Sequence, residues 1–190
     1  MLSSIDLHIT TTPLPIETLS PEEVKHLKAY SHESARTQAL LGMALRRKVL
    51  GSGVASLPAY MSLSHTQGLA VLAVHPEAHQ CLGVDVECCR RKAPSPKTIQ
   101  WLGLDDTEKA MIQQLPPLGV WCVKEALWKA WRFNANTVVK TVRILELTLD
   151  EVGDFTGEAQ TPTGEKLSWS LRRLEKAGVS YYLALATSHK

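Results

Sequence analysis

The stretch WCVKEALWK, residues 121–129, has the clearest structural pattern in the sequence. Its apolar residues recur every three to four positions, which predicts a helix with one buried face. Glu125 and Lys129 stand one turn apart on the opposite face, flanked by Trp121 and Trp128. Because tryptophans flank the pair, we expect it to lie in a half-buried cleft. The alternative is an ordinary surface ion pair, which contributes only about 0.3–0.5 kcal/mol.

Upstream of this helix, residues 81–87 predict a buried strand that contains GVDVE. Side chains two positions apart on a strand point to the same face, so Asp85 and Glu87 lie together while Val84 and Val86 face the core. Two neighbouring carboxylates repel each other unless a cation relieves them, and oxygen ligands of this kind suit Mg²⁺. A solvent-facing strand with two acidic residues is the alternative.

Further upstream, SLSHTQG at residues 62–68 predicts a polar turn that enters a buried strand over residues 69–74. Hydroxyl groups, an imidazole and backbone amides at such a place can bind a phosphate. Ser64 and His65 are therefore candidate phosphate ligands. A turn with a structurally paired histidine is the alternative, and the six other histidines are assigned to structural positions.

Composition sets the broad class of protein. The 190 residues are 44% hydrophobic and 21% charged, which is ordinary for a globular protein, and they can form one domain or two small fused lobes. A net charge of +2 indicates neither a nucleic-acid partner nor a membrane partner. No apolar run reaches the roughly 20 residues of a membrane span, and the first residues lack a secretory pattern. With four cysteines that show no zinc spacing, we expect a cytoplasmic protein.

The remaining patterns outline a mixed α+β chain. A helix is predicted to begin at Pro21, and others cover residues 34–50, 105–114 and 119–132. Further strands are predicted over residues 142–149, 167–171 and 181–186. Proline-rich residues 88–98 predict a linker between an N-terminal lobe, 1–98, and a C-terminal lobe, 99–190, packed as one functional unit. Ser62-x-Ser64 recurs as Ser168-x-Ser170, which leaves an internal duplication open.

Taken together, the three stretches resemble the Sfp-type 4′-phosphopantetheinyl transferase family. That family has a Ser-x-Ser-His turn, a Gly-x-Asp-x-Glu strand and a Trp-x-x-Lys-Glu-Ala-x-x-Lys helix, and all three stand here in that order. Leu41-Gly42 followed by Arg46-Arg47 resembles an upstream helix of the family. The resemblance implies an α+β fold of two similar lobes, related by a pseudo-twofold axis, with the active site in the cleft between them.

The resemblance also implies a reaction. The phosphopantetheine arm of coenzyme A would move to a serine of an acyl or peptidyl carrier protein, with Mg²⁺ as cofactor and 3′,5′-ADP as the leaving product. By motif position, Asp85, Glu87 and Glu125 would ligate the metal. Lys129 would neutralise the transferred phosphoryl group, assisted by Lys124. Glu125 is also the candidate general base, and the sequence does not separate the two roles of Glu125.

At the nucleotide end, the resemblance implies that Ser64 and His65 bind the 3′ phosphate, with Arg46 or Arg47 assisting. The basic run at residues 90–92 is a candidate docking surface for the carrier, because carrier proteins are usually acidic helical bundles. Two fused lobes would make a monomer sufficient.

The sequence departs from the family pattern in three places. Residues 51–60 are shorter than the usual segment and lack its Gly-Lys-Pro, Met43 stands where an arginine is common, and residues 130–134 lack the usual glycines. These departures leave a second class of function open, a non-catalytic scaffold that binds carrier proteins and has lost coenzyme A binding. Metal-dependent diphosphate hydrolysis is a third possibility, although it does not account for all three stretches.

Overall fold

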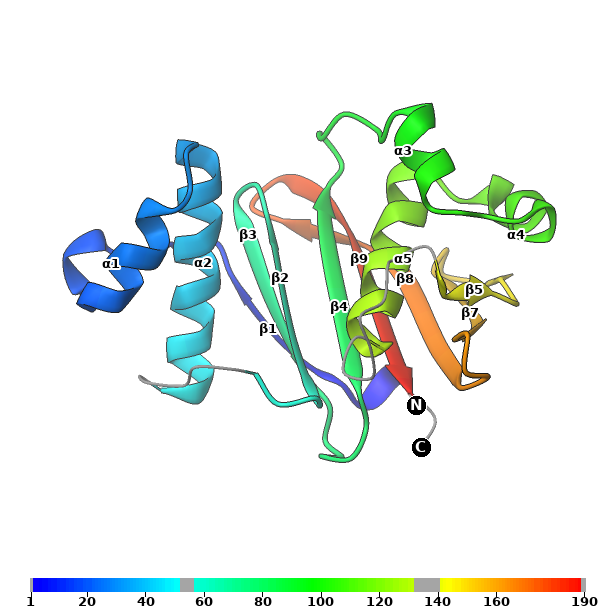
Figure 1. Ribbon diagram of the computed structural model, residues 1–190, viewed down its shortest axis with the longest axis horizontal. Coiled ribbons are helices and arrows are strands. Elements are labelled where there is room, and N and C mark those ends of the chain that lie inside the picture. Colours follow the sequence, from blue (N-terminus) through cyan, green and yellow to red (C-terminus); the bar gives the residue numbers. More distant parts are fainter. Residues whose placement is uncertain (1, 52–56, 132–140, 189–190) are drawn as a thin grey trace.

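The computed structural model describes residues 2–51, 57–131 and 141–188, and these residues form a mixed α+β fold with two sheets (Figure 1). The helices are α1 (Pro21–Lys28), α2 (Glu33–Leu50), α3 (Pro96–Trp101), α4 (Asp106–Met111) and α5 (Pro117–Trp131). The strands are β1 (Asp6–Thr10), β2 (Met61–Thr66), β3 (Leu69–Val74), β4 (Leu82–Cys88), β5 (Arg143–Ile144), β6 (Thr148–Leu149), β7 (Phe155–Gln160), β8 (Lys166–Lys176) and β9 (Val179–Ser188).

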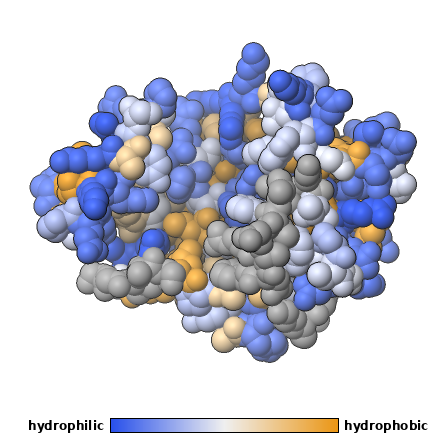
Figure 2. Space-filling view, viewed as in Figure 1, coloured by the Kyte–Doolittle hydropathy of each residue, from blue (hydrophilic) through white to orange (hydrophobic). Residues whose placement is uncertain are grey.

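The two sheets are built from separate parts of the chain and are antiparallel throughout. The smaller sheet has the order β1-β3-β2, and α2 packs on it. The larger sheet has the order β4-β9-β8-β7-β5, with β6 paired to β7. In Figure 1, α1 and α2 lie at one side of the molecule, and α5 crosses the strands of the larger sheet. Figure 2 shows a mainly hydrophilic surface on this face, with small apolar groups between.

Local signals explain where the first helices begin and end. Ser20 caps α1 through a capping box with Glu23, and Pro21 occupies the first turn. Gly51 ends α2 with a φ of 79°, a conformation that glycine adopts without strain. In the described part of the chain, no helix is long and apolar enough to cross a membrane.

The structure corrects the predicted turn at residues 62–68. Residues 61–66 form strand β2, and the turn is confined to the next two residues, where Gly68 has a φ of 77°. Strand β2 pairs with β3 along its whole length. Two further elements were not predicted: helix α3, which begins inside the predicted linker, and strand β7. The predicted end of the last helix, Arg132, lies outside the described residues.

A close contact between α5 and β4 positions the side chains of the candidate site. Gly83, the second residue of β4, faces the helix backbone, and a Cβ built on it would lie 1.9 Å from the Ala126 carbonyl oxygen. Only glycine therefore lets the helix come this close to the strand. The predicted apolar face of α5 is buried, and it packs in the largest core cluster with residues of β8 and β9. Asp85 and Glu87 lie on the same face of β4 as Gly83, so they point toward α5.

Candidate active site

The carboxylate of Asp85 lies where β2, β4 and α5 meet. Lys129 Nζ from α5 donates to Asp85 Oδ1 at 2.7 Å, and the Ser64 hydroxyl from β2 donates to the same oxygen at 2.8 Å. Lys129 Nζ also contacts Ser64 Oγ at 3.2 Å and the Val84 carbonyl oxygen at 3.0 Å. Both charged side chains are largely buried, with 14% of Lys129 and 8% of Asp85 exposed. Three motifs that are distant in the sequence therefore converge on one carboxylate.

Glu87, two residues further along β4, is buried and has two partners. Arg91 forms an ion pair with its Oε1, and the Thr66 hydroxyl from β2 donates to its Oε2 at 3.4 Å. Burial raises the pKa of Glu87 above the ordinary value for glutamate, while the Arg91 guanidinium opposes that rise. Thr66 was not singled out by the sequence patterns, although its alternation with the two serines of β2 was visible.

Glu125 lies half buried on the polar face of α5, between Trp121 and Trp128, as predicted. Burial is the main cause that raises the pKa of Glu125, and the negative charge of Asp85 adds to the rise. The positive charge of Lys129 acts in the opposite direction. The glutamate thus shares its surroundings with the β4 carboxylates.

His65 lies on β2 and faces helix α2. A Cβ built on Gly42 would lie 3.2 Å from His65 Cδ2, so the ring packs where the helix has no side chain. Arg46 follows Gly42 by one turn on the same face of α2. Desolvation by its surroundings lowers the pKa of His65, although the residue stays exposed, and the positive charge of Lys129 lowers it further. Helix α2 therefore lies against the imidazole at Gly42.

The contacts of Arg47 and Lys124 are with other parts of the molecule, not with the residues of the candidate site. The Arg47 guanidinium pairs with Glu23 and donates to the Thr18 carbonyl oxygen at 3.0 Å, which ties α2 to the segment around α1. Lys124 is fully buried on the other side of α5, where its Nζ donates to Glu108 Oε1 at 2.8 Å. Sequence reasoning missed Glu108, whose only signal was its position as the capping-box residue of α4.

The chemistry of the carboxylates fits a divalent cation, although the side chains are not arranged around one. Among residues 2–51, 57–131 and 141–188, no group of three or more histidine, cysteine, aspartate or glutamate side chains is placed to hold a metal ion. Asp85 Oδ2, however, is buried and has no hydrogen-bond partner in the described residues. A buried carboxylate oxygen without a partner is costly, and a cation would relieve it. The oxygen donors are those that Mg²⁺ prefers.

Comparisons with known proteins bear on the family to which the chain belongs. No curated protein matches the chain. A family model, the 4′-phosphopantetheinyl transferase superfamily, matches residues 81–186, which is more than half of the sequence and includes β4 and α5. The chain belongs to the 4′-phosphopantetheinyl transferase superfamily.

Proposed function

We propose that this protein is an Sfp-type enzyme that transfers the phosphopantetheine arm of coenzyme A to a serine of an acyl or peptidyl carrier protein. Membership of the superfamily implies the general reaction and both substrates. The observation that carries the proposal is the meeting of Asp85, Lys129 and Ser64 at one point, with Glu87 and Glu125 beside them. A solvated surface would not gather three acidic side chains in partly buried positions.

Asp85, Glu87 and Glu125 would hold the divalent cation. The unpartnered Oδ2 of Asp85 supports this assignment, as do the raised pKa values of the two glutamates, which reflect carboxylates crowded together under partial burial. When bound, the cation would stabilise negative charge on the diphosphate of coenzyme A. Lys129, already placed against Asp85, would supply a second positive charge for the same phosphates.

Glu125 would accept the proton of the carrier serine. As the serine oxygen forms its bond to the β-phosphorus, the bond from that phosphorus to the oxygen of 3′,5′-ADP breaks, and the hydroxyl proton passes to a carboxylate. A raised pKa makes a carboxylate a better base at neutral pH. Burial and the charge of Asp85 supply that rise for Glu125.

The phosphate of the nucleotide end would bind to His65 and Arg46, with Ser64 close by. Gly42 places the imidazole against α2, and Arg46 lies one turn along the same helix face. Arg47 and Lys124 support the fold instead, because each is held by a glutamate elsewhere. Of the departures from the family pattern, the shortened segment 51–60 lies partly outside the described residues, and residues 132–134 lie wholly outside them.

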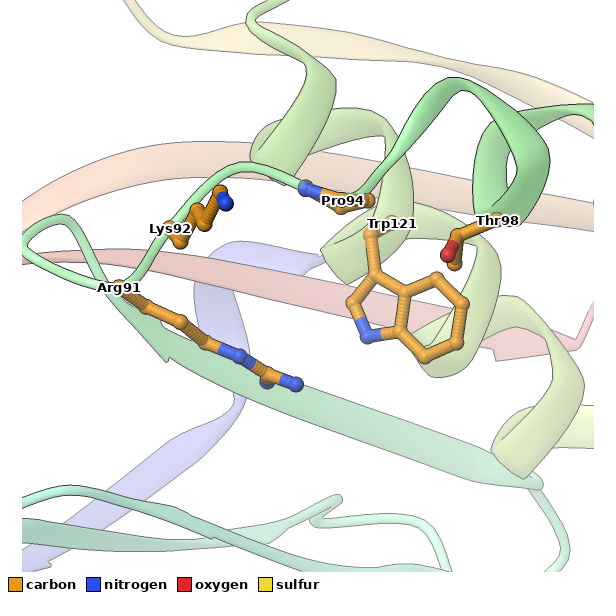
Figure 3. Close-up of a pocket in the computed structure, with 5 residues that line it drawn as sticks. All are labelled: Arg91, Lys92, Pro94, Thr98 and Trp121. Carbon is orange, nitrogen blue, oxygen red and sulfur yellow. The ribbon is translucent and has the colours of Figure 1, made fainter.

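The proposal includes two lobes, 1–98 and 99–190, related by a pseudo-twofold axis with the active site between them. It is supported by the position of the site where the two sheets meet, since Ser64 belongs to the smaller sheet and Asp85, although it precedes residue 98, belongs to the larger one, on which α5 carries Lys129. A carrier would dock beside the site on the basic run at residues 90–92. Figure 3 shows a pocket there, between the segment after β4 and helices α3 and α5, lined by Arg91, Lys92, Pro94, Thr98 and Trp121.

The purified protein, incubated with coenzyme A, Mg²⁺ and a panel of apo carrier proteins, tests this proposal. We expect at least one carrier to gain the mass of one phosphopantetheine arm, and we expect chelation of the metal to prevent the gain. No gain on any carrier, together with no binding of coenzyme A by calorimetry, would contradict the proposal and favour the scaffold alternative.

A further inference from the structure

Three hydroxyl groups of β2 join the two sheets of the molecule. Strands β2 and β4 lie side by side but belong to different sheets. Instead of a backbone ladder, side-chain hydroxyls of β2 accept hydrogen bonds from backbone N–H groups of β4. The three bonds run from Val84 N to Ser62 Oγ (2.9 Å), from Val86 N to Ser64 Oγ (3.3 Å) and from Cys88 N to Thr66 Oγ1 (3.4 Å). We call these three residues of β2 the hydroxyl ladder.

The ladder is regular because both strands advance by two residues at each step. Each hydroxyl accepts from the N–H group 22 residues later in the chain. A hydroxyl also has one proton to donate. Ser64 and Thr66 donate theirs to the side chains 21 residues later, which are Asp85 and Glu87. The same two hydroxyls therefore fasten the sheets together and hold the carboxylates.

Ser62 differs from the other two because it donates to no carboxylate of the site. It accepts the Val84 N–H in the same way, but the residue 21 positions later is Gly83, which has no side chain. Ser62 thus joins the sheets without contacting a carboxylate of the site. Ser62 is therefore a control that separates the two roles of the hydroxyl ladder, joining the sheets and holding the carboxylates.

The hydroxyls also determine which carboxylate oxygens are occupied. Ser64 and Lys129 both contact Asp85 Oδ1, while Oδ2 is the buried oxygen without a partner in the described residues. Thr66 contacts Glu87 Oε2. Partners that fix the orientation of a ligating carboxylate are worth about 10–100-fold in metal affinity.

We propose that Ser64 and Thr66 are positioning residues, which orient Asp85 and Glu87 toward the cation and couple that orientation to the joint between the two sheets. The inference rests on the proposed function, because it assumes the cation site. It assigns a role to Thr66, which no motif of the sequence had indicated.

Three variants separate the orientation of the Glu87 carboxylate from simple support of the fold. They are Thr66→Val, Thr66→Ser and Ser62→Ala. Valine has nearly the shape of threonine and suits a buried strand, so Thr66→Val removes the hydroxyl with little change in packing. Binding of Mn²⁺ in the presence of coenzyme A is measured by the loss of the free-ion electron paramagnetic resonance signal, with coenzyme A alone as the blank. Unfolding midpoints are measured without metal.

Thr66→Val and Ser62→Ala should both lower the unfolding midpoint by about 2–4 °C, because each loses one bridge between the sheets. Only Thr66→Val should weaken Mn²⁺ binding, by about tenfold, and Thr66→Ser should restore it. If Thr66→Val binds Mn²⁺ as tightly as Ser62→Ala, the positioning role is wrong although the proposed function stands. If the wild-type protein binds no Mn²⁺ beyond the blank, the cation site of the proposed function is itself contradicted, and the positioning role fails with it.

Discussion

At the scale of single residues, Gly83 sets how closely α5 approaches the carboxylate strand. A methyl group at this position would lie 1.9 Å from the Ala126 carbonyl oxygen and 2.6 Å from the Ala130 nitrogen, and both are backbone atoms that cannot turn away. We therefore expect Gly83→Ala to lower the free energy of unfolding by about 3 kcal/mol or more, the upper range for overpacking. Chemical denaturation measures the change.

Gly42→Ala is the matched control for that substitution. Its Cβ would meet only side-chain atoms, His65 Cδ2 at 3.2 Å and Leu63 Cδ2 at 3.4 Å, and alanine favours a helix by up to about 1 kcal/mol over glycine. Its stability should stay within about 1 kcal/mol of the wild type. Equal losses in the two variants would show that the α5 backbone is not what requires Gly83.

At the scale of elements, a buried ion pair holds α5 against α4 and the strand after it. Lys124 Nζ donates to Glu108 and to the Val142 carbonyl oxygen, and the Ile144 N–H donates to the same glutamate oxygen at 2.8 Å. Lys124→Met leaves the Glu108 charge buried without its cation, so we expect a loss of about 3–5 kcal/mol in unfolding free energy. Adding Glu108→Gln should recover part of that loss, because the uncompensated charge is removed.

Two further measurements separate this structural role from phosphate binding. Lys109→Met removes the exposed pair with Asp106 and should leave the denaturation curve unchanged. A Lys124→Met protein that keeps its stability but loses affinity for coenzyme A would contradict the structural assignment and favour the role that the resemblance implies for Lys124.

The same scale shows which elements the sequence could predict. The capping box before α1, the glycine after α2 and the apolar run of β3 are local signals, and all three elements form within a residue or two of their predicted bounds. Strand β2 has few apolar residues, and the partners of its hydroxyls lie on β4, in another sheet, and on α5. Strand β7 is similar, since its Gly157 is required by the Glu146 carbonyl oxygen, 1.9 Å from a built Cβ. The alternation of the β2 hydroxyls is visible in the sequence, but it does not identify the residues that they contact.

Only part of the candidate site could be predicted from the sequence. The spacing of Asp85 and Glu87, and of Glu125 and Lys129, places each pair on one face of its own element, and the structure agrees. Different partners distinguish the two lysines of α5. Lys124 contacts Glu108, 16 residues away in the chain, and Lys129 contacts Asp85, 44 residues away. Because both lysines stand in the same motif, only the fold separates the buried one from the one at the cluster.

At the scale of the whole molecule, the basic run after β4 predicts how a carrier is recognised. Arg91 is paired with Glu87, which leaves Arg90 and Lys92 as the residues to change. The double variant Arg90→Glu/Lys92→Glu should raise the KM for an acidic carrier about tenfold, because like charges across an interface repel. The KM for coenzyme A should stay the same. An unchanged carrier KM, or a KM that does not rise with ionic strength in the wild type, would place docking elsewhere.

The most direct test of the account is the mass of an accepted carrier after a single turnover with coenzyme A and Mg²⁺, compared among the wild type, Glu125→Gln and Glu158→Gln. Glu158, which pairs with Lys166 on the larger sheet away from α5, is the control. Both the wild type and Glu158→Gln should load the carrier at the same rate. Removal of the Glu125 carboxylate, the general base that we propose, should slow loading by about 10²–10⁴-fold, the usual contribution of such a base. Loading by Glu125→Gln at the wild-type rate would show that the chemistry does not take place at this cluster.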